Sequence, residues 1–209
     1  MPLFYQQNIN QNTRLAIWHI TEPLSFFLTK VPIQKTITHP HKQLQHAAGR
    51  YLLPYLFEDF PYDEILIAST RKPYLPDEQY HFSISHCGDY VAAIVSKNER
   101  VGIDIEKPQQ KIVNISTKFL HKEEYQFLRY GGDLMATTTL LWNAKEAMFK
   151  WWGLGKIDFK TMLRIEQMDA SSQTLKGCFR KNGIQQPLEL HYELLPDLCL
   201  VWVNTPTLV

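Results

Sequence analysis

The order of the predicted elements repeats along this chain, and that order restricts the possible folds more than any other feature. Each half reads as one strand, then helices, then a run of strands, although no convincing sequence repeat accompanies the match. The order therefore predicts an α/β (α+β) fold of two similar lobes, residues 1–99 and 100–209. Each lobe should be a small, mostly antiparallel sheet packed against helices. Because ligands commonly bind between such lobes, we expect the active site in the cleft.

Local signals place the individual elements. A helix from Thr38 has apolar residues at the spacing of one buried face until Pro54, which we expect to kink or end it. A longer helix begins at about Asp133 and ends at Gly153. The other predicted elements are a short helix through Phe27, helical segments at 112–119 and 122–130, and strands at 14–20, 64–69, 80–85, 90–96, 100–106, 162–167, 174–180, 188–194 and 198–203.

Composition argues against several classes of protein. A formal net charge of +1 and a pI near 7.7 give no overall basic excess, so we expect no nucleic-acid partner. The three cysteines fit neither a disulfide framework nor a paired zinc motif, and we interpret them as reduced thiols of a cytoplasmic protein. The start of the chain lacks the pattern of a secretory signal, and no run of about 18 apolar residues predicts a membrane span.

Two acidic residues share one face of the strand at 100–106. Side chains alternate along a strand, so Asp104 and Glu106 point to one side while Ile103 and Ile105 point to the other. Paired carboxylates suit a hard cation such as Mg²⁺, which takes oxygen ligands. The alternative interpretation is an exposed strand with two solvated acids, because short acidic alternations are common in sequences.

The long helix carries charged residues among aromatic ones. Glu146 and Lys150 are four residues apart and share a face, which on a surface helix makes an ordinary ion pair. Four aromatic residues lie on several sides of the same helix, so much of it should be buried. If Glu146 faces Asp104 and Glu106, three carboxylates need a cation among them, and Lys150 can then hold a phosphate.

The strand at 80–85 runs into a glycine-containing turn, with Ser85 and His86 at its end. Such a strand end can present a hydroxyl and an imidazole to an anion. The chain is not expected to be a serine hydrolase, because neighbours on a strand point to opposite faces and no G-x-S-x-G elbow is present here. Lys72, in the loop before this strand, adds a cation that can line a phosphate pocket.

Four stretches in this order resemble the larger, pseudo-dimeric type of 4'-phosphopantetheinyl transferase. They are Ala48-Gly49-Arg50 with Leu52-Leu53, Lys72-Pro73 with residues 82–86, residues 101–107, and residues 142–150. The last two are diagnostic, since they are similar to the family's G-[IV]-D-x-E and W-[SCT]-x-K-E-[AS]-x-x-K patterns. Their conjunction outweighs the surface interpretations given above. Asn143 departs from the small hydroxyl or thiol residue usual in the family.

The resemblance implies two lobes related by pseudo-twofold symmetry, with coenzyme A (CoA) in the cleft between them. It implies an enzyme that transfers the 4'-phosphopantetheine arm of CoA to a serine of an acyl or peptidyl carrier protein and releases 3',5'-ADP. The implied cofactor is Mg²⁺, for which Mn²⁺ can substitute. A chain with two fused lobes further implies a monomer, with no membrane partner.

The same resemblance assigns roles to particular residues. Asp104, Glu106 and Glu146 would ligate Mg²⁺, Lys150 would pair with a phosphate oxygen, and Glu146 is the first candidate for the base that activates the carrier serine. The catalytic set is therefore Asp104, Glu146 and Lys150. The residues expected to contact CoA are Lys72, Ser85, His86 and Lys150, with Lys42 and Arg50 as weaker candidates. Arg50 has the alternative of a structural ion pair.

A basic and apolar segment follows the acidic strand. Residues 107–122 contain four lysines and no acid, interleaved with apolar side chains. In the family this region lies beside the carrier, and carriers of this kind are typically acidic, so we expect docking there. The expected docking residues are Lys111, Ile115, Lys118 and Phe119. The alternative is an amphipathic segment with solvated lysines.

Two other functions stay open at this point. One is a CoA-binding or scaffold protein without turnover, although all the expected acids and Lys150 are present. The other is a different Mg²⁺-dependent phosphoryl-transfer enzyme or nuclease, which the near-neutral charge and the lack of a P-loop pattern disfavour.

Overall fold

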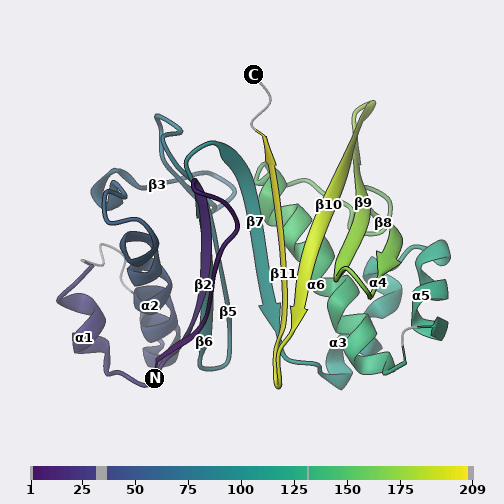
Figure 1. Ribbon diagram of the computed structural model, residues 1–209, viewed down its shortest axis with the longest axis horizontal. Helices are drawn as coiled ribbons and strands as arrows, with labels where there is room; N and C mark the ends of the chain where they lie inside the picture. The colour runs from purple at the N-terminus through teal and green to yellow at the C-terminus, as the bar shows by residue number, and fades with distance from the viewer. Residues whose placement is uncertain (1, 32–36, 131, 207–209) are drawn as a thin grey trace. The chain divides into compact units, whose positions relative to one another are not determined.

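A computed structural model of the chain describes residues 2–31, 37–130 and 132–206, and its fold is of the α+β class (Figure 1). The chain divides into two compact units, the first built mainly of Met1–Val101 and the second of Gly102–Thr205. Each unit has its own sheet and its own helices, and each is described here by itself.

The N-terminal unit is an antiparallel sheet of four strands in the order β1-β2-β6-β5. These strands are β1 (Leu3–Asn8), β2 (Thr13–His19), β5 (His81–Cys87) and β6 (Tyr90–Ser96). Helix α2 (Pro40–Leu56) packs on one face of the sheet, and α1 (Leu24–Leu28) packs against α2. Trp18, Leu52, Phe82 and Val95 are among the residues of the core between α2 and the strands. A short ribbon of β3 (Leu66–Ile67) and β4 (Pro73–Tyr74) follows the 3-10 helix η1 (Tyr62–Glu64).

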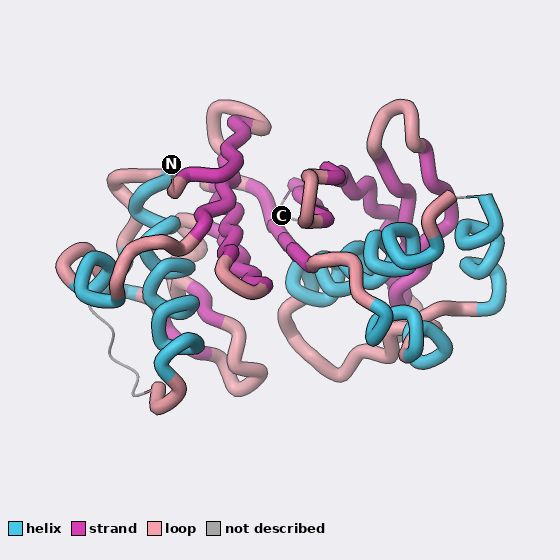
Figure 2. Tube along the Cα trace, turned by 90° about the horizontal axis from the view of Figure 1, so that it is seen from below, coloured by secondary structure: helices cyan, strands magenta, loops and turns pink. Residues whose placement is uncertain are grey.

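The C-terminal unit is a five-stranded sheet in the order β7-β11-β10-β9-β8. Its strands are β7 (Glu99–Glu106), β8 (Leu163–Asp169), β9 (Thr174–Lys181), β10 (Ile184–Leu194) and β11 (Cys199–Pro206). Its helices are α3 (Gln110–Asn114), α4 (Ser116–Phe119), η2 (Lys122–Glu124), α5 (Tyr125–Tyr130) and α6 (Leu134–Trp152). Helix α6 packs on the sheet, and α3, α4 and α5 pack against α6. Figure 2 shows the helices of each unit gathered beside its own strands.

Helix α6 begins and ends where its capping residues predict. The Asp133 carboxylate accepts hydrogen bonds from the backbone N–H groups of Met135 and Ala136, at 2.8 and 3.2 Å. At the other end Gly153 adopts a left-handed conformation with φ of 74°, and its N–H donates to Phe149. The sequence prediction of this helix is confirmed at both ends.

The two units share an order of strand pairing. In the first, β2 pairs with β6, the last strand of that sheet along the chain; in the second, β7 pairs with β11, again the last strand. In both, the longest helix lies between these two strands in the sequence. In each unit, the predicted pattern of strand, helices and strands therefore gives a sheet in which the strand before the long helix pairs with the last strand.

Several predicted boundaries were wrong. Strand β1 was missed, because it lies at the edge of its sheet and alternates between half-buried and exposed residues, with three polar residues among six. Helix α2 continues through Pro54 to Leu56, since a proline so near the end of a helix removes only one late hydrogen bond. The predicted strand at 64–69 is reduced to β3, and the short helix predicted through Phe27 extends one residue further, to Leu28.

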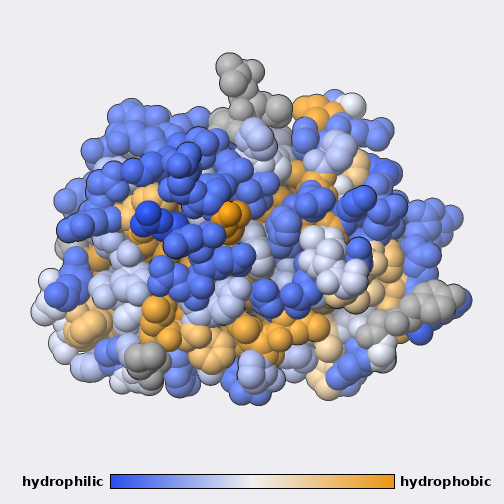
Figure 3. Space-filling model, in the orientation of Figure 1, coloured by the Kyte–Doolittle hydropathy of each residue, from blue (hydrophilic) through white to orange (hydrophobic). Residues whose placement is uncertain are grey.

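The face of the molecule shown in Figure 3 is mostly hydrophilic, with smaller apolar areas between the hydrophilic ones. The large apolar side chains that remain exposed include Leu154 and Ile67, at 61% and 58% of their full accessibility. Within the parts of the chain that the structure describes, no helix combines the length and apolar character that crossing a membrane requires.

Candidate functional site

Strand β7 brings its two acids to the side where α6 lies. A Cβ atom at Gly102 would come within 2.8 Å of the backbone nitrogen of Trp151 and would also collide with the carbonyl oxygen of Ala147. Only glycine permits this close packing of β7 on α6. Since every second residue of a strand faces the same way, Asp104 and Glu106 face α6 as Gly102 does.

The structure contradicts the interpretation of β7 as an exposed acidic strand. Asp104 is only 5% exposed, and Ile103 and Ile105 on the opposite face are fully buried. Glu106 is half-buried and accepts a hydrogen bond from the side chain of Gln109 at 3.2 Å. A buried carboxylate needs a positive or hydrogen-bonding partner, so the acids of β7 belong to a built site.

Lys150 supplies that partner for Asp104. Its Nζ lies 2.6 Å from Asp104 Oδ1, and its side chain is 24% exposed against 7% for the aspartate. The prediction gave Lys150 a phosphate oxygen as its partner, whereas in this structure the ammonium group is paired with Asp104. The ammonium group of Lys150 supplies a positive charge beside these acids.

Glu146 lies one helical turn before Lys150 and is coupled to the same acids. The pKa of Glu146 is raised to about 7, mainly by burial and then by the negative charge of Asp104; the positive charge of Lys150 opposes the rise, and Glu106 adds to it. The negative charges of Asp104 and Glu106 therefore both affect the ionisation of Glu146.

The donor chemistry of this cluster fits a hard divalent cation. Three carboxylates that repel one another offer the oxygen ligands that Mg²⁺ takes in proteins. Among the described residues, however, no group of three or more His, Cys, Asp or Glu side chains is already arranged as a metal site. Of the three acids, Asp104 forms an ion pair with Lys150.

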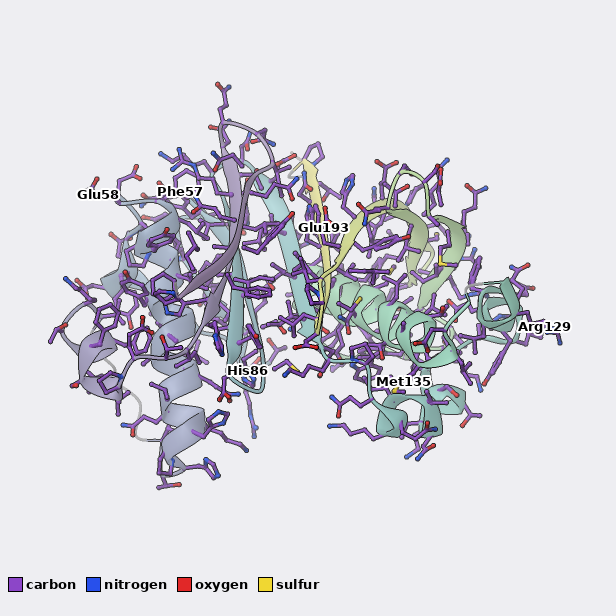
Figure 4. All side chains as sticks on the ribbon, turned by 60° about the horizontal axis from the view of Figure 1, so that its bottom comes forward. Phe57, Glu58, His86, Arg129, Met135 and Glu193 are labelled. Atoms are coloured by element: carbon purple, nitrogen blue, oxygen red, sulfur yellow. The ribbon has the colours of Figure 1, made fainter. Side chains whose placement is uncertain are left out.

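Ser85 and His86 stand near the end of β5 but on opposite faces of the sheet. Ser85 is 5% exposed, while His86 is exposed at the end of the β5–β6 hairpin, where Figure 4 labels it. The structure thus offers His86 to solvent from the N-terminal unit and keeps the Ser85 side chain covered.

Burial and a neighbouring positive charge set the electrostatic environment of Lys72. Burial lowers its pKa to about 8, and the positive charge of Arg100 contributes to the decrease. Lys72 in turn lowers the pKa of His81, for which burial is the main cause and Arg100 a further one. His81 precedes His86 by five residues on one strand, roughly 16 Å along it. The prediction missed His81 and Arg100, because they come together only through the fold.

The two weaker candidates for CoA contacts differ in exposure. Lys42 is exposed on the first turn of α2, where its backbone N–H donates to the capping residue His39 at 3.4 Å. Arg50 is 7% exposed, and burial lowers its pKa. Among the described residues no carboxylate pairs with Arg50, and its Nη1 is buried without a hydrogen-bond acceptor. The alternative of a structural ion pair therefore has no support there.

Comparison with known proteins assigns the second unit to a family. Residues 100–201, which contain β7, α6 and all four residues of the acidic site, match the family model of the 4'-phosphopantetheinyl transferase superfamily. Through this segment, the chain is similar to that superfamily. The predicted resemblance is thereby confirmed.

Individual relatives agree with the family model. The chain is 33% identical over 110 residues to the 4'-phosphopantetheinyl transferase gsp of Aneurinibacillus migulanus, covering 51% of this chain and 45% of the relative. It is 33% identical over 113 residues to the enterobactin synthase component D of Escherichia coli K12, covering 52% and 54%. It is 34% identical over 87 residues to a 4'-phosphopantetheinyl transferase of Bacillus subtilis, covering 40% and 38%. The matches span about half the length of these relatives or less.

The expected docking residues separate into two groups. Lys111 and Lys118 are exposed on α3 and α4, and Ile115 between the two helices is half-buried. Phe119 is 1% exposed and packs in the core against Trp142, with ring centroids 5.0 Å apart. Its side chain cannot meet a partner, because it fills the space between α4 and α6. We therefore leave Phe119 out of the docking surface.

The family pattern contains one more functional-looking residue that the sequence prediction left without a role. Lys145 is completely buried, and its Nζ donates to Glu124 at 2.7 Å and to the carbonyl oxygens of Phe119 and Phe159 at 2.8 and 2.9 Å. Glu124 is also completely buried. These contacts connect α6 to η2, to the end of α4 and to the loop before β8, so Lys145 fixes the position of α6.

Proposed function

We propose that this chain transfers the 4'-phosphopantetheine arm of CoA to a serine of a carrier protein. The observation that carries the proposal is the coupled group of Asp104, Glu106, Glu146 and Lys150, which lies wholly within the segment that matches the superfamily. The serine oxygen would form a bond to the phosphorus that bears the pantetheine arm. The bond from that phosphorus to the bridging oxygen breaks, and 3',5'-ADP leaves.

Glu146 is the proposed base for the serine hydroxyl. A serine hydroxyl is a weak nucleophile at neutral pH and needs a base to take its proton. A carboxylate whose pKa is raised to about 7 is a better proton acceptor than an ordinary glutamate.

Asp104, Glu106 and Glu146 are the proposed ligands of Mg²⁺, and CoA is the proposed co-substrate. When bound, the metal supplies positive charge that stabilises the pyrophosphate and the leaving phosphate. Lys150 adds a second positive charge in the same place, and we propose that it pairs with a phosphate oxygen when CoA is present.

Residues of the N-terminal unit are proposed to hold the nucleotide end of CoA. His86 is the first candidate, since it is exposed at a hairpin end. Lys72, Lys42 and Arg50 are further cationic candidates, and Ser85 is a weaker one because its side chain is buried. The cations of this unit suit the phosphates at that end of CoA.

The location and assembly of the protein are also proposals. A cytoplasmic location suits the interpretation of the three cysteines as reduced thiols. We propose that a single chain is sufficient for activity, because the acids and Lys150 all come from one unit of it.

The decisive experiment incubates the purified chain with CoA, Mg²⁺ and an apo carrier protein. Mass spectrometry should show the carrier heavier by one phosphopantetheine, attached to a serine, with 3',5'-ADP released. Binding of CoA without any change in the carrier would instead identify a CoA-binding protein without turnover. Hydrolysis of CoA or of nucleic acid with an unmodified carrier would identify a different phosphoryl-transfer enzyme.

The docking surface is tested by reversing its charges. Lys111 and Lys118 are exposed on neighbouring short helices, and Lys160 lies beside them, donating to the carbonyl oxygen of Thr117 at 3.0 Å. Changing Lys111 and Lys118 to Glu should raise the KM for an acidic carrier by about fivefold to tenfold, because exposed interface charges contribute modestly to affinity. The KM for CoA should stay the same, and the dependence of transfer on salt should weaken.

Lys176→Glu, an exposed lysine on β9, is the control for charge reversal itself. It should leave both KM values close to those of the unchanged protein. Equal effects of Lys118→Glu and Lys176→Glu on the carrier KM would show that only net charge matters and that the docking surface lies elsewhere.

A further inference from the structure

The hairpin that carries His86 closes with a two-residue turn. Cys87 pairs with Tyr90, which leaves Gly88 and Asp89 as the turn, and Gly88 has a left-handed φ of 55°. Such a turn requires residues that tolerate positive φ, and its carbonyl groups ordinarily face water. Here both carbonyls of the turn are hydrogen-bonded to other parts of the N-terminal unit.

The first of these bonds comes from α2. Gln45 donates through Nε2 to the carbonyl oxygen of Gly88 at 2.8 Å, and the glutamine is only 7% exposed. One turn further along α2, a Cβ atom at Gly49 would come within 2.8 Å of Ile84, so this part of the helix lies close against β5. A buried amide is unfavourable in such a place unless it is hydrogen-bonded. Gln45 is therefore tied to the turn rather than to the core.

Further contacts, from α2 and from the end of β2, hold the turn in place. The backbone N–H of Ile20, after β2, donates to the carbonyl oxygen of Asp89 at 2.7 Å. His41 Nε2 lies 2.9 Å from Asp89 Oδ1. Tyr90 stacks on His19 with centroids 4.6 Å apart, which fixes the first residue of β6. Two segments distant in sequence thus fix one short turn, a degree of order that a solvent-exposed hairpin end does not need for folding alone.

We propose that Gln45 is a positioning residue for CoA: by holding the Gly88–Asp89 turn against α2, it fixes the strand end on which His86 stands. The inference rests on the proposed function, since it requires His86 to contact CoA. A contact held in place before binding loses less conformational freedom when the ligand arrives. Gln45 would thus act on CoA affinity without touching CoA.

The test replaces Gln45 by Met, which has a similar shape and no donor. Gln45→Met should raise the KM for CoA about fivefold to tenfold, the factor that one ordinary hydrogen bond supplies, and should leave kcat within about twofold. In a His86→Ala background the same change should raise the KM little further, because the residue through which Gln45 acts is gone. Gln43→Met, on the same helix without a side-chain contact to the turn, is the matched control.

A second measurement needs no activity. Amide hydrogen exchange at residues 86–90 should be faster in Gln45→Met than in the unchanged protein, and unaltered in Gln43→Met. Asp89→Ala, an exposed change that cannot disturb the core, should raise the KM for CoA in the same direction by a smaller factor.

An unchanged KM in a folded Gln45→Met protein with normal transfer would overturn the inference and leave the proposed function standing. So would a rise in KM that is just as large in the His86→Ala background. If the unchanged protein transfers nothing, the proposed function fails, and accelerated exchange at the turn still shows that Gln45 orders the turn.

Discussion

Asp104→Asn is expected to lower the rate of phosphopantetheine transfer by about 100-fold to 1,000-fold while leaving the fold intact. Asparagine has the shape of aspartate, and its oxygen can still accept the hydrogen bond from Lys150 that Asp104 accepts at 2.6 Å. What is lost is a negative charge at the proposed metal site. Metal-assisted stabilisation of a reacting phosphate contributes several kcal/mol, and each 1.4 kcal/mol corresponds to a factor of ten in rate.

The measurement is initial-rate transfer to an apo carrier at saturating CoA, over a series of Mg²⁺ concentrations. Asp133→Asn is the matched control, because Asp133 caps α6 and asparagine is an equally good capping residue. The control should retain its rate and its melting temperature. Transfer by a folded Asp104→Asn protein at close to the normal rate would remove Asp104 from the site and weaken the case for Mg²⁺.

Local signals were sufficient for much of the fold. Helix α6 was predicted at both ends because Asp133 and Gly153 act within one turn of the helix they cap. Strand β1 was not predicted, because an edge strand has little buried surface to impose an apolar pattern on its sequence. Strand β3 was predicted too long, at 64–69. It has only two residues, and both of their side chains are exposed.

The residues of the candidate site were also predicted only in part. Alternation along β7 was enough to place Asp104 and Glu106 on one face, and the family patterns brought in Glu146 and Lys150. The sequence could not reveal that Phe119 is a core residue, because an amphipathic segment has the same pattern whether its apolar side meets a core or a partner. Nor could it pair Lys145 with Glu124, which are 21 residues apart in the chain.

That buried pair is the most demanding charge arrangement among the described residues. Burial lowers the pKa of Lys145 to about 8, and Glu124 opposes the decrease, so the lysine remains charged at pH 7. Glu124 in turn accepts backbone hydrogen bonds from Ile165 at 2.7 Å and from His121 at 2.6 Å. Removing either member leaves the charge of the other buried without its counter-charge.

Lys145→Met should therefore lower the free energy of unfolding by about 3–5 kcal/mol, because it leaves the Glu124 carboxylate buried without its counter-charge. For a chain of this length that corresponds to a melting temperature lower by roughly 6–20 °C. The double variant Lys145→Met/Glu124→Gln removes both charges and keeps an acceptor for one of the two backbone N–H groups, so it should be more stable than Lys145→Met alone.

Lys176→Met, at an exposed position, controls for the loss of a lysine. Thermal unfolding of the single and double variants measures the coupling between the two residues. If the losses of the single variants simply add in the double variant, then Lys145 and Glu124 do not stabilise each other, and the support of α6 must come from its apolar packing.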